Sequence, residues 1–354
     1  MTKAELDNRK ILPLEDSWYR RVKEKLDGIA KPLDGLGKFE HLIAQIGAIE
    51  KTTKISIQKK AVLVMCADNG VVEEQVSQSG KEVTLAVAKA MGVNNSSVGK
   101  MAAVAGVDVI PVDIGIDTDE VIPGVLPRKV AKGTKNFAKE PAMTEEEVLK
   151  AIETGIQLVQ QCHREGYEIL ATGEMGIGNT TTSTAVAAAL LDLAVEQVTG
   201  KGAGLTDEAL KRKCRVIKEA IEKYSLRDAD AFTILKTVGG LDIAGLTGVF
   251  IGAAIEQIPV VIDGVISAVA ALLAETLCKG AVNYMIPSHK SRELAETAIM
   301  KKLHLDPVLD ADMALGEGTG AVMMMSLLDV ALGVYLQGAS FANFEIEQYK
   351  RYEE

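Results

Sequence analysis

The chain has 354 residues and a formal net charge of -10, from 49 acidic and 39 basic side chains. Apolar residues make up 47% of the chain and aromatic residues only 4%, which indicates a large core of aliphatic side chains, as in helices packed on a parallel sheet. Such an acidic chain lacks the basic surface that a nucleic-acid partner requires, so we expect a small-molecule ligand.

The cysteines and the N-terminus indicate a protein of the cytoplasm. Cys66, Cys162, Cys214 and Cys278 lie far apart, with the spacing of neither a zinc site nor a disulfide framework, so we expect reduced thiols. The four histidines are also scattered, which predicts no metal site. The first residues lack the apolar stretch of a signal peptide, and Gly, Asp or Glu interrupts the longest apolar runs, so we expect no membrane contact.

The chain begins with a predicted helical arm. Apolar residues at helical spacing and a charged face predict a helix over 14–30, and the Pro- and Gly-containing segment 32–37 ends it. We expect residues 1–30 and the C-terminal 338–354 to form a small helical appendage. Residues 31–337 then form one α/β domain that binds the ligand and carries the chemistry.

From residue 31 onward one pattern recurs: an apolar, β-branched run, a turn with Asp, Glu or Gly, and an Ala-rich helix. The apolar runs cover 61–67, 108–114, 167–171, 259–262 and 281–286, and the last unit spans 311–320, with helices such as 184–195 and 321–336 after the turns. Near-continuous apolar strands between helices indicate an open, mostly parallel sheet with helices on both faces, a Rossmann-like α/β fold. The polar turns then gather at the carboxyl ends of the strands, where such sheets bind ligands.

The segment 171–183, Ala-Thr-Gly-Glu-Met-Gly-Ile-Gly-Asn-Thr-Thr-Thr-Ser, predicts a phosphate site. A strand precedes it and a helix follows it, and Gly176 and Gly178 let the backbone amides at the helix start approach an anion. The segment is no Walker loop, because no Lys follows the last glycine. The alternative is an ordinary turn in which Asn179 or Thr180 caps the helix.

Two glutamates are candidates for chemistry. Glu174 lies beside the predicted phosphate site, where a carboxylate is unfavourable unless it contacts a cation or takes part in the reaction. Glu317, in the Gly-Glu-Gly-Thr-Gly loop 316–320, is the best candidate for a general base, because a glutamate partly removed from water can accept a proton near neutrality. The alternative for Glu317 is an exposed loop acid at a helix start.

Three further segments are candidate ligand contacts. Residues 200–207 resemble part of a dinucleotide fingerprint, but no strand precedes them and the third glycine is misplaced, so we reject an NAD site. This loop would supply amides, and residues 211–213 a cation, to an anionic ligand; alternatively, the basic residues form a solvated helix face. Asp242 and Asp263 follow predicted strands and either cap a helix or bind a ribose hydroxyl. We interpret His289 as structural or exposed.

Taken in order, these motifs resemble those of the nicotinate-nucleotide:dimethylbenzimidazole phosphoribosyltransferase family. The resemblance extends from about residue 31 to residue 321, and segments 32–40 and 68–70 support it. Its most specific pieces are residues 173–181, 263–267, 288–289 and 315–321.

The resemblance implies an enzyme that transfers the 5-phosphoribosyl group of nicotinate mononucleotide to 5,6-dimethylbenzimidazole, in the assembly of the lower-ligand nucleotide of cobamides. The pyridinium leaves as a neutral molecule, so neither a metal, a general acid nor a cofactor is required. By resemblance, Glu317 removes the N–H proton of the benzimidazole, and Glu174 lies close to the reacting centre, where we expect it to support developing positive charge. Displacement on the face opposite the leaving group converts a β-riboside into an α-riboside.

The resemblance also implies the two halves of the binding site. The residues expected to hold the phosphate and ribose are Gly176, Ile177, Gly178, Asn179, Thr180, Gly202, Lys213, Asp263, Gly316, Gly318 and Thr319. Those expected to border the acceptor base are Ser77, Ser79, Gly80, Met175 and Leu315. Many relatives carry an aromatic or apolar residue and Pro within 77–80, where this chain has Ser-Gln-Ser-Gly. This smaller, more polar wall leaves simpler benzimidazoles, purines and phenolic bases open as acceptors.

Two other functions use the same loops. A nucleotide or riboside hydrolase would use Glu317 to activate water, although a base pocket that excludes water argues against it. A non-catalytic sensor would bind nicotinate mononucleotide without consuming it. The resemblance further implies a homodimer.

Overall fold

The computed structural model describes residues 1–202 and 204–351, and within them the main sheet has six parallel strands in the order β3-β2-β1-β4-β5-β6. The strands are β1 (Lys60–Ala67), β2 (Val107–Gly115), β3 (Leu126–Pro127), β4 (Ile169–Met175), β5 (Val260–Ile262) and β6 (Met285–Pro287). The predicted α/β fold with a mostly parallel sheet is confirmed. The strand order reverses between β1 and β4, and the crevice at the carboxyl ends of these strands is where doubly wound sheets bind ligands.

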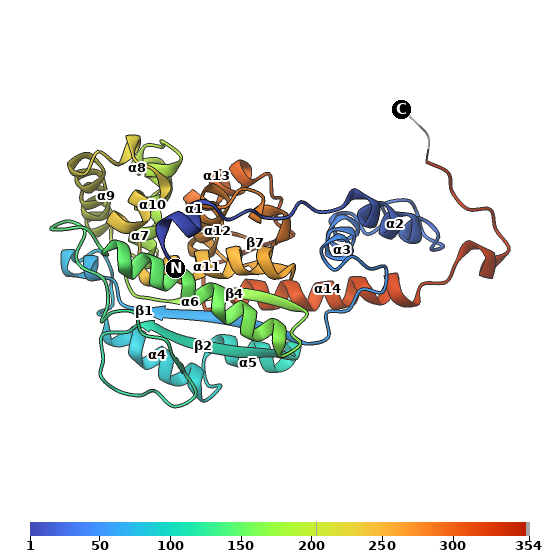
Figure 1. Cartoon of the computed structure of the whole chain (residues 1–354), viewed down its shortest axis with the longest axis horizontal. Helices are drawn as coiled ribbons and strands as arrows, with labels where there is room; N and C mark the ends of the chain where they lie inside the picture. The colour runs from blue at the N-terminus through green and yellow to red at the C-terminus, as the bar shows by residue number, and fades with distance from the viewer. Residues whose placement is uncertain (203, 352–354) are drawn as a thin grey trace.

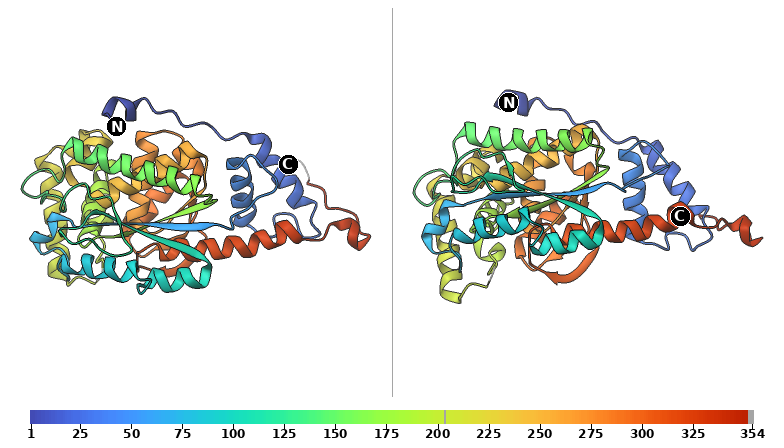
Figure 2. Two further views of the ribbon diagram at one scale, coloured as in Figure 1. Left: turned by 60° about the horizontal axis from the view of Figure 1, so that its bottom comes forward. Right: turned by 90° about the horizontal axis from the view of Figure 1, so that it is seen from below.

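Helices cover both faces of the sheet, as Figure 2 shows. One layer contains α6 (Glu145–Arg164), α7 (Asn179–Leu190), α10 (Ala231–Val238), α11 (Leu241–Glu256) and α12 (Val265–Leu277). The other contains α3 (Lys38–Ile49), α4 (Glu82–Gly92), α5 (Ser97–Ala105) and α14 (Thr319–Gln337). All of β1 is buried, and its side chains alternate between the layers: Leu63 and Met65 pack in the first, and Val62 and Val64 in the second.

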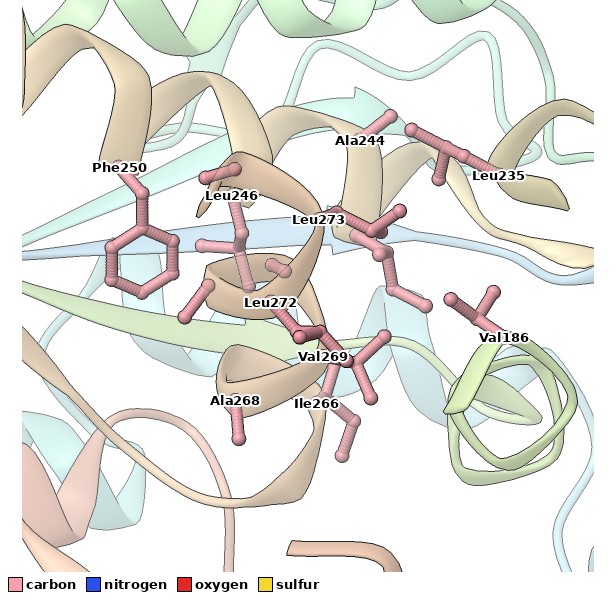
Figure 3. Close-up of a cluster of buried hydrophobic side chains, with 14 of the residues drawn as sticks. Val186, Leu235, Ala244, Leu246, Phe250, Ile266, Ala268, Val269, Leu272 and Leu273 are labelled. Carbon is pink, nitrogen blue, oxygen red and sulfur yellow. The ribbon is translucent and has the colours of Figure 1, made fainter. Parts of the chain in front are cut away.

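Helices α11 and α12 contribute a cluster of buried apolar side chains to the first layer (Figure 3). Leu246 and Phe250 of α11 and Leu273 of α12 are fully buried and belong to one apolar cluster with Val186 of α7 and Leu235 of α10. Burial of such side chains stabilises the fold by about 1.5–3 kcal/mol each. Because α7 and α12 begin at loops that follow β4 and β5, this packing also fixes those loops.

The remaining elements connect these layers. They are α1 (Lys3–Asp7), α2 (Asp16–Asp27), η1 (Gly70–Glu74), α8 (Val195–Val198), α9 (Asp207–Lys223), η2 (Leu226–Asp228), η3 (Ala281–Tyr284), β7 (His289–Ser291), α13 (Leu294–Leu303), β8 (Leu309–Met313) and η4 (Phe341–Phe344).

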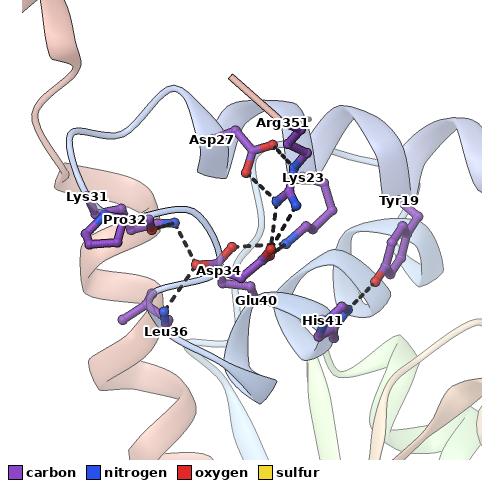
Figure 4. A network of polar contacts seen from close by, with 10 residues as sticks. All are labelled: Tyr19, Lys23, Asp27, Lys31, Pro32, Asp34, Leu36, Glu40, His41 and Arg351. Atoms are coloured by element: carbon purple, nitrogen blue, oxygen red, sulfur yellow. Dashed lines mark hydrogen bonds and ion pairs between the residues drawn. The ribbon is translucent and has the colours of Figure 1, made fainter. Parts of the chain in front are cut away.

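The helix α2 and the end of α14 lie to one side of the sheet, with α3 beside α2 (Figure 1). A polar network joins α2 and α3 (Figure 4), in which the buried Glu40 accepts hydrogen bonds from Lys31 Nζ at 2.6 Å and Lys23 Nζ at 3.0 Å. Burial acts to raise the pKa of Glu40, but the two lysines outweigh it and hold the pKa below its usual value. Helix α3, which the sequence assigned to the catalytic domain, thus packs with the arm; the domain boundary at residue 30 stays a prediction.

The C-terminal tail is attached to the same network. Arg351 Nε donates to Asp27 Oδ2 at 2.6 Å, and its Nη1 donates to Asp34 Oδ2 at 2.8 Å. Bidentate guanidinium–carboxylate pairs of this kind fix orientation as well as charge. The segment that contains Asp27 and Asp34 therefore meets the C-terminal tail beside α2 and α3 (Figure 4).

Helix α14 has 19 residues and a window of mean hydropathy 1.7, which by length and composition alone would suit a membrane span. Of that window, 56% is buried inside the protein. The helix packs against α5, β4 and β5, and these contacts account for its apolar face.

Five local predictions were wrong in extent or partner. Strand β4 continues past Ala171 to Met175, because residues 173–175 pair with β1. Most of 281–286 is the turn η3, which Glu275 closes by accepting the amides of Gly280 and Val282.

The helix predicted over 184–195 instead begins at Asn179 and ends at Leu190. Its hydroxyls are satisfied within the helix, as where Thr184 Oγ1 donates to Thr180 O at 2.7 Å. The last strand, β8, pairs with β7 outside the main sheet, and its largely exposed residues explain why it is no core strand. Asp242 lies in α11 after a helix rather than after a strand.

Candidate active site

A pocket opens at the carboxyl ends of β4 and β5, beside the switch point of the sheet. It is lined by residues 76–78, 174–180, 263–267 and 314–317, together with Lys201, Gly202, Gly204, Leu205, His289, Ser291 and Glu293. Segments that are far apart in the sequence therefore meet in one cavity.

One end of the pocket suits an anion. Lys213 is fully buried, and its Nζ donates to Thr180 Oγ1 at 3.1 Å and to Gly200 O at 3.2 Å. Burial lowers the pKa of Lys213 to about 8. Thr180 lies in the first turn of α7, whose partial positive charge adds to the attraction for a phosphate.

The loop beside Lys213 already presents an amide to a carboxylate. Gly202 has φ +53 and its N–H donates to Glu293 Oε1 at 3.1 Å. A Cβ on Gly202 would lie 3.1 Å from Thr180 Oγ1, so the loop packs closely on the start of α7. The Thr180 hydroxyl and the loop of Gly202 thus line this end of the pocket, with the Lys213 ammonium directly behind the hydroxyl.

The opposite end is acidic. Glu174, only 9% exposed, accepts a short hydrogen bond from Asn179 Nδ2, and the same nitrogen donates to Asp242 Oδ2 at 3.0 Å. Burial raises the pKa of Glu174 to about 8, with the nearby Asp242, Asp263 and Glu317 adding to the rise.

Glu317 lies on a tight loop directly above β4. Its φ is +61, and its Oε2 accepts a hydrogen bond from Val98 N, in the first turn of α5, at 3.0 Å. A Cβ on Gly173 would lie 2.6 Å from Glu317 O, and one on Gly316 would lie 2.6 Å from Glu174 Oε1. These two glycines therefore let the loop of Glu317 approach the strand that carries Glu174.

Asp263 joins β5 to the start of α14. Its carboxylate accepts three backbone hydrogen bonds, from Gly318 N at 3.2 Å, Gly320 N at 2.8 Å and Ala321 N at 3.1 Å. Burial raises the pKa of Asp263, while the neighbouring His289 and these amides act in the opposite direction. The carboxylate thereby holds the loop 316–318 in place, although Asp263 also lines the pocket.

A pocket with an ammonium and helix amides at one end and carboxylates at the other matches a ligand with a phosphate and a cationic group. A family model described as phosphoribosyltransferase, DBI_PRT, matches residues 11–346. The chain belongs to this family.

Proteins of known name support the same assignment. The nicotinate-nucleotide--dimethylbenzimidazole phosphoribosyltransferase of Clostridium acetobutylicum is 43% identical over 337 residues, which cover 95% of this chain and 96% of that protein. The enzyme of the same name from Acetivibrio thermocellus is 45% identical over 329 residues, 93% of this chain and 94% of that protein. The crystal structure of CobT from Thermus thermophilus superposes with a TM-score of 0.89 at 34% identity and covers 94% of this chain and all of that one.

In this phosphoribosyltransferase the pocket brings together most of the predicted site residues. Those that line it are Glu174, Met175, Gly176, Ile177, Gly178, Asn179, Thr180, Gly202, Asp263, Leu315, Gly316, Glu317 and Ser77. The other predicted residues, Ser79, Gly80, Lys213, Gly318 and Thr319, are not part of the lining among the described residues. Lys213 acts from behind Thr180, Thr319 Oγ1 donates to Gly316 O at 2.9 Å, and a Cβ on Gly80 would meet the carboxylate of Glu82.

Two glycines that the sequence assigned to phosphate contact are required by the packing and backbone of the protein. A Cβ on Gly176 would lie 2.6 Å from both Ala67 O and Asp242 Oδ2. Gly178 has φ +93 and caps α7, where neither Asn179 nor Thr180 does. The alternative, in which Asn179 or Thr180 caps the helix, was therefore wrong, and Asn179 is directed to the carboxylates instead.

Several lining residues were not among the predicted site residues, although some lie in the motifs that the sequence analysis named; they include Gln78, Val265, Ser267, Ser291 and Glu293. Ser267 and Ser291 follow Asp263-Gly264 and Ser288-His289, so their position in polar turns was a usable signal. No local sequence signal marks Glu293, because its contact with Gly202 joins loops that are 91 residues apart.

Proposed function

We propose that this chain transfers the 5-phosphoribosyl group of nicotinate mononucleotide to 5,6-dimethylbenzimidazole or a related lower-ligand base, and so contributes to cobamide synthesis. The observation that carries the proposal is the charge distribution of the pocket, which is basic around Lys213 and acidic around Glu174. The donor nucleotide has the matching polarity, with a phosphate on one side of the ribose and a pyridinium cation on the other.

The donor half of the reaction needs stabilisation of positive charge. Lys213, Thr180 Oγ1 and the amides at the start of α7 would hold the 5'-phosphate. Glu174 would face the ribose C1', where positive charge develops as the C1'–N bond breaks and the pyridine nitrogen takes the bonding electrons. Nicotinate then leaves without a proton from the enzyme.

The acceptor half needs a base. Glu317 lines the pocket, and the Val98 amide fixes one of its carboxylate oxygens. It would remove the N–H proton of the benzimidazole while the other ring nitrogen attacks C1', a contribution of about 10² to 10⁴ in rate. Attack opposite the leaving group would give an α-riboside 5'-phosphate.

The identity of the acceptor rests on the wall formed by residues 76–78. Ser77 and Gln78 line the pocket beside Met175 and Leu315. A wall that combines hydroxyl and amide groups with apolar side chains suits a flat aromatic base with or without polar substituents. We therefore keep simpler benzimidazoles, purines and phenols as acceptors beside 5,6-dimethylbenzimidazole.

The test is a product assay by chromatography and mass spectrometry. Purified protein is incubated with nicotinate mononucleotide and a panel of benzimidazoles, purines and phenols, and nicotinate and riboside phosphates are measured. We expect product only with an acceptor. Nicotinate released without acceptor would indicate the hydrolase, and nucleotide binding without turnover would indicate the sensor.

Replacement of the base sharpens this test. Glu317→Gln removes the proton acceptor but keeps the hydrogen bond that the Val98 amide donates, and we expect it to lose most of the acceptor-dependent rate. The matched control is Asp312→Asn, an exposed carboxylate that precedes the same loop and lies outside the described pocket lining. We expect Asp312→Asn to keep wild-type turnover.

A homodimer in the cytoplasm completes the proposal. Val330 and Leu336 on α14 and Phe344 and Ile346 in the tail are exposed apolar side chains, which a second copy would cover. The free cysteines suit a reducing compartment. Light scattering would give the mass of a dimer, and Val330→Lys would reduce it to that of a monomer.

A further inference from the structure

Two buried carboxylates share one neutral donor at the acidic end of the pocket. Glu174 is 9% exposed and Asp242 is 0% exposed, and Asn179 Nδ2 donates a hydrogen bond to each. An amide nitrogen carries two protons, so both are used. The neighbouring Asn69, whose Nδ2 lies close to the same glycine turn, is neutral as well.

Among the described residues, no positively charged side chain pairs with these carboxylates. Within the described part of the chain, neither Glu174 nor Asp242 forms an ion pair with Lys, Arg or His. The other charged groups that face Glu174 are the carboxylates of Asp263 and Glu317, and both have the same sign. Lys213 lies on the far side of Thr180, to which it donates.

Two uncompensated charges so close together in a buried site are strongly unfavourable. Desolvation disfavours each anion, and the two anions repel one another at short range. Such a pair titrates in two steps, with one proton retained near neutral pH. Burial accordingly raises the pKa of Glu174 to about 8 and that of Asp242 to about 6.

The two carboxylates differ in their access to a ligand. Glu174 lines the pocket, whereas Asp242 lies behind the turn at Gly176, where a Cβ would be 2.6 Å from Asp242 Oδ2. Asp242 Oδ1 also accepts the hydrogen bond from Ile243 N at 3.0 Å, which fixes the carboxylate on α11. A ligand therefore contacts Glu174, and Asp242 acts on Glu174 from behind, through its charge and through the shared donor Asn179.

We propose that Glu174, Asn179 and Asp242 form a proton store that releases one proton to solvent when the pyridinium cation of the donor nucleotide binds. The inference rests on the proposed function, because the cation comes from that donor. The pyridinium nitrogen of the incoming ring takes over, beside Glu174, the positive charge that the proton supplied before. Asp242 is then a positioning residue that sets the pH range of this exchange.

Calorimetry with two ligands isolates the effect. Binding heats are measured at pH 7 in buffers of different ionisation enthalpy, which gives the number of protons exchanged. Nicotinate mononucleotide is compared with ribose 5-phosphate, which has the same phosphate and so the same effect on Lys213 but no cation. We expect the nucleotide to release about one proton more than the sugar phosphate.

Three variants assign the proton. Glu174→Gln removes the carboxyl that faces the ligand and should abolish the difference between the two ligands. Asp242→Asn removes the like charge, so Glu174 should lose its proton at a lower pH than in the wild type. The pH above which the two ligands no longer differ in proton release should therefore fall by about one unit. Glu50→Gln is the matched control: burial also raises the pKa of Glu50 to about 8, but Glu50 lies outside the described pocket lining, and the difference should be unchanged.

The outcomes separate this inference from the proposed function. Equal proton counts for the two ligands in a wild-type enzyme that turns over would overturn the proton store alone. A Glu174→Gln variant that retains the excess release would also overturn it. Failure of nicotinate mononucleotide to bind would overturn both. The comparison of the two ligands in the wild-type protein tests the proton store even where a variant fails to fold.

Discussion

The substitution Gly320→Ala sets helix propensity against packing. Gly320 is the second residue of α14 and has no left-handed backbone angle, so alanine there would by propensity alone stabilise the helix by about 1 kcal/mol. The structure predicts the opposite. A Cβ at this position would lie 2.0 Å from His289 Nδ1 and 3.0 Å from Asp263 Oδ1.

The size of the effect follows from what must move. The His289 ring is 4% exposed and its Nδ1 lies 2.9 Å from Ser288 Oγ, so it has little room to turn away. Overpacking of this kind costs about 1–3 kcal/mol, which leaves a net loss of up to about 2 kcal/mol after the gain in propensity. Gly333→Ala is the control in the same helix, because nothing lies within 4 Å of its Cβ, and it should gain about 0.5–1 kcal/mol.

Stability is measured by urea unfolding, and an unchanged m-value shows that a shift of the midpoint reports stability alone. Activity is then measured as steady-state turnover. We expect Gly320→Ala to lower the midpoint and Gly333→Ala to raise it. Gly320→Ala should also lower kcat/KM, because His289 and Asp263 line the pocket. If Gly320→Ala stabilised the protein as much as Gly333→Ala and kept wild-type turnover, the packing argument and the assignment of this pocket would both be refuted.

Three further predictions concern single groups. Glu317→Gln should lower kcat by about 10² to 10⁴ and leave the affinity for the nucleotide unchanged in direct binding, since a base acts only in the reaction. Because burial lowers the pKa of Lys213 to about 8, Lys213 loses its charge as the pH rises through 8, and the affinity for ribose 5-phosphate should fall over that range but not in Lys213→Met. Arg351→Ala removes the pairs with Asp27 and Asp34, which are partly exposed, so stability should change by less than about 1 kcal/mol while limited proteolysis removes the tail faster; an unchanged cleavage rate would contradict the attachment.

The parts of the fold that the sequence predicts are those with local signals. Strand β1 is apolar throughout because helices cover both of its faces, and this makes a run of eight buried residues visible without an alignment. The same logic located β2 and β5. It failed for β8, where Asp310 and Asp312 already argued against a core strand, and for the turn η3, whose closure by Glu275 is a contact between side chain and backbone.

The candidate site was harder to predict because its strongest interactions join distant segments. Glu174 was recognised as unusual from its neighbours alone, but its partner Asp242 is 68 positions away in the sequence and reaches it only through Asn179. Lys213 was noted as one of three adjacent cations, and nothing local distinguishes the buried one from its solvated neighbours. Burial of a charge is decided by tertiary packing, which spacing does not encode.

The glycines around the pocket connect the sequence pattern to the chemistry in a way that differs from the prediction. Gly176 was predicted to open the backbone to a phosphate, yet a Cβ there would first meet a protein atom, Asp242 Oδ2, at 2.6 Å. A Cβ on the neighbouring Gly173 would likewise lie 2.6 Å from Glu317 O. These glycines therefore bring carboxylates together before any ligand arrives. Such close approach places three acidic side chains around one point, an arrangement whose repulsion only a bound cation or proton relieves. The same glycine pattern that predicts an anion site thus also builds the acidic end on which the proposed reaction at C1' depends.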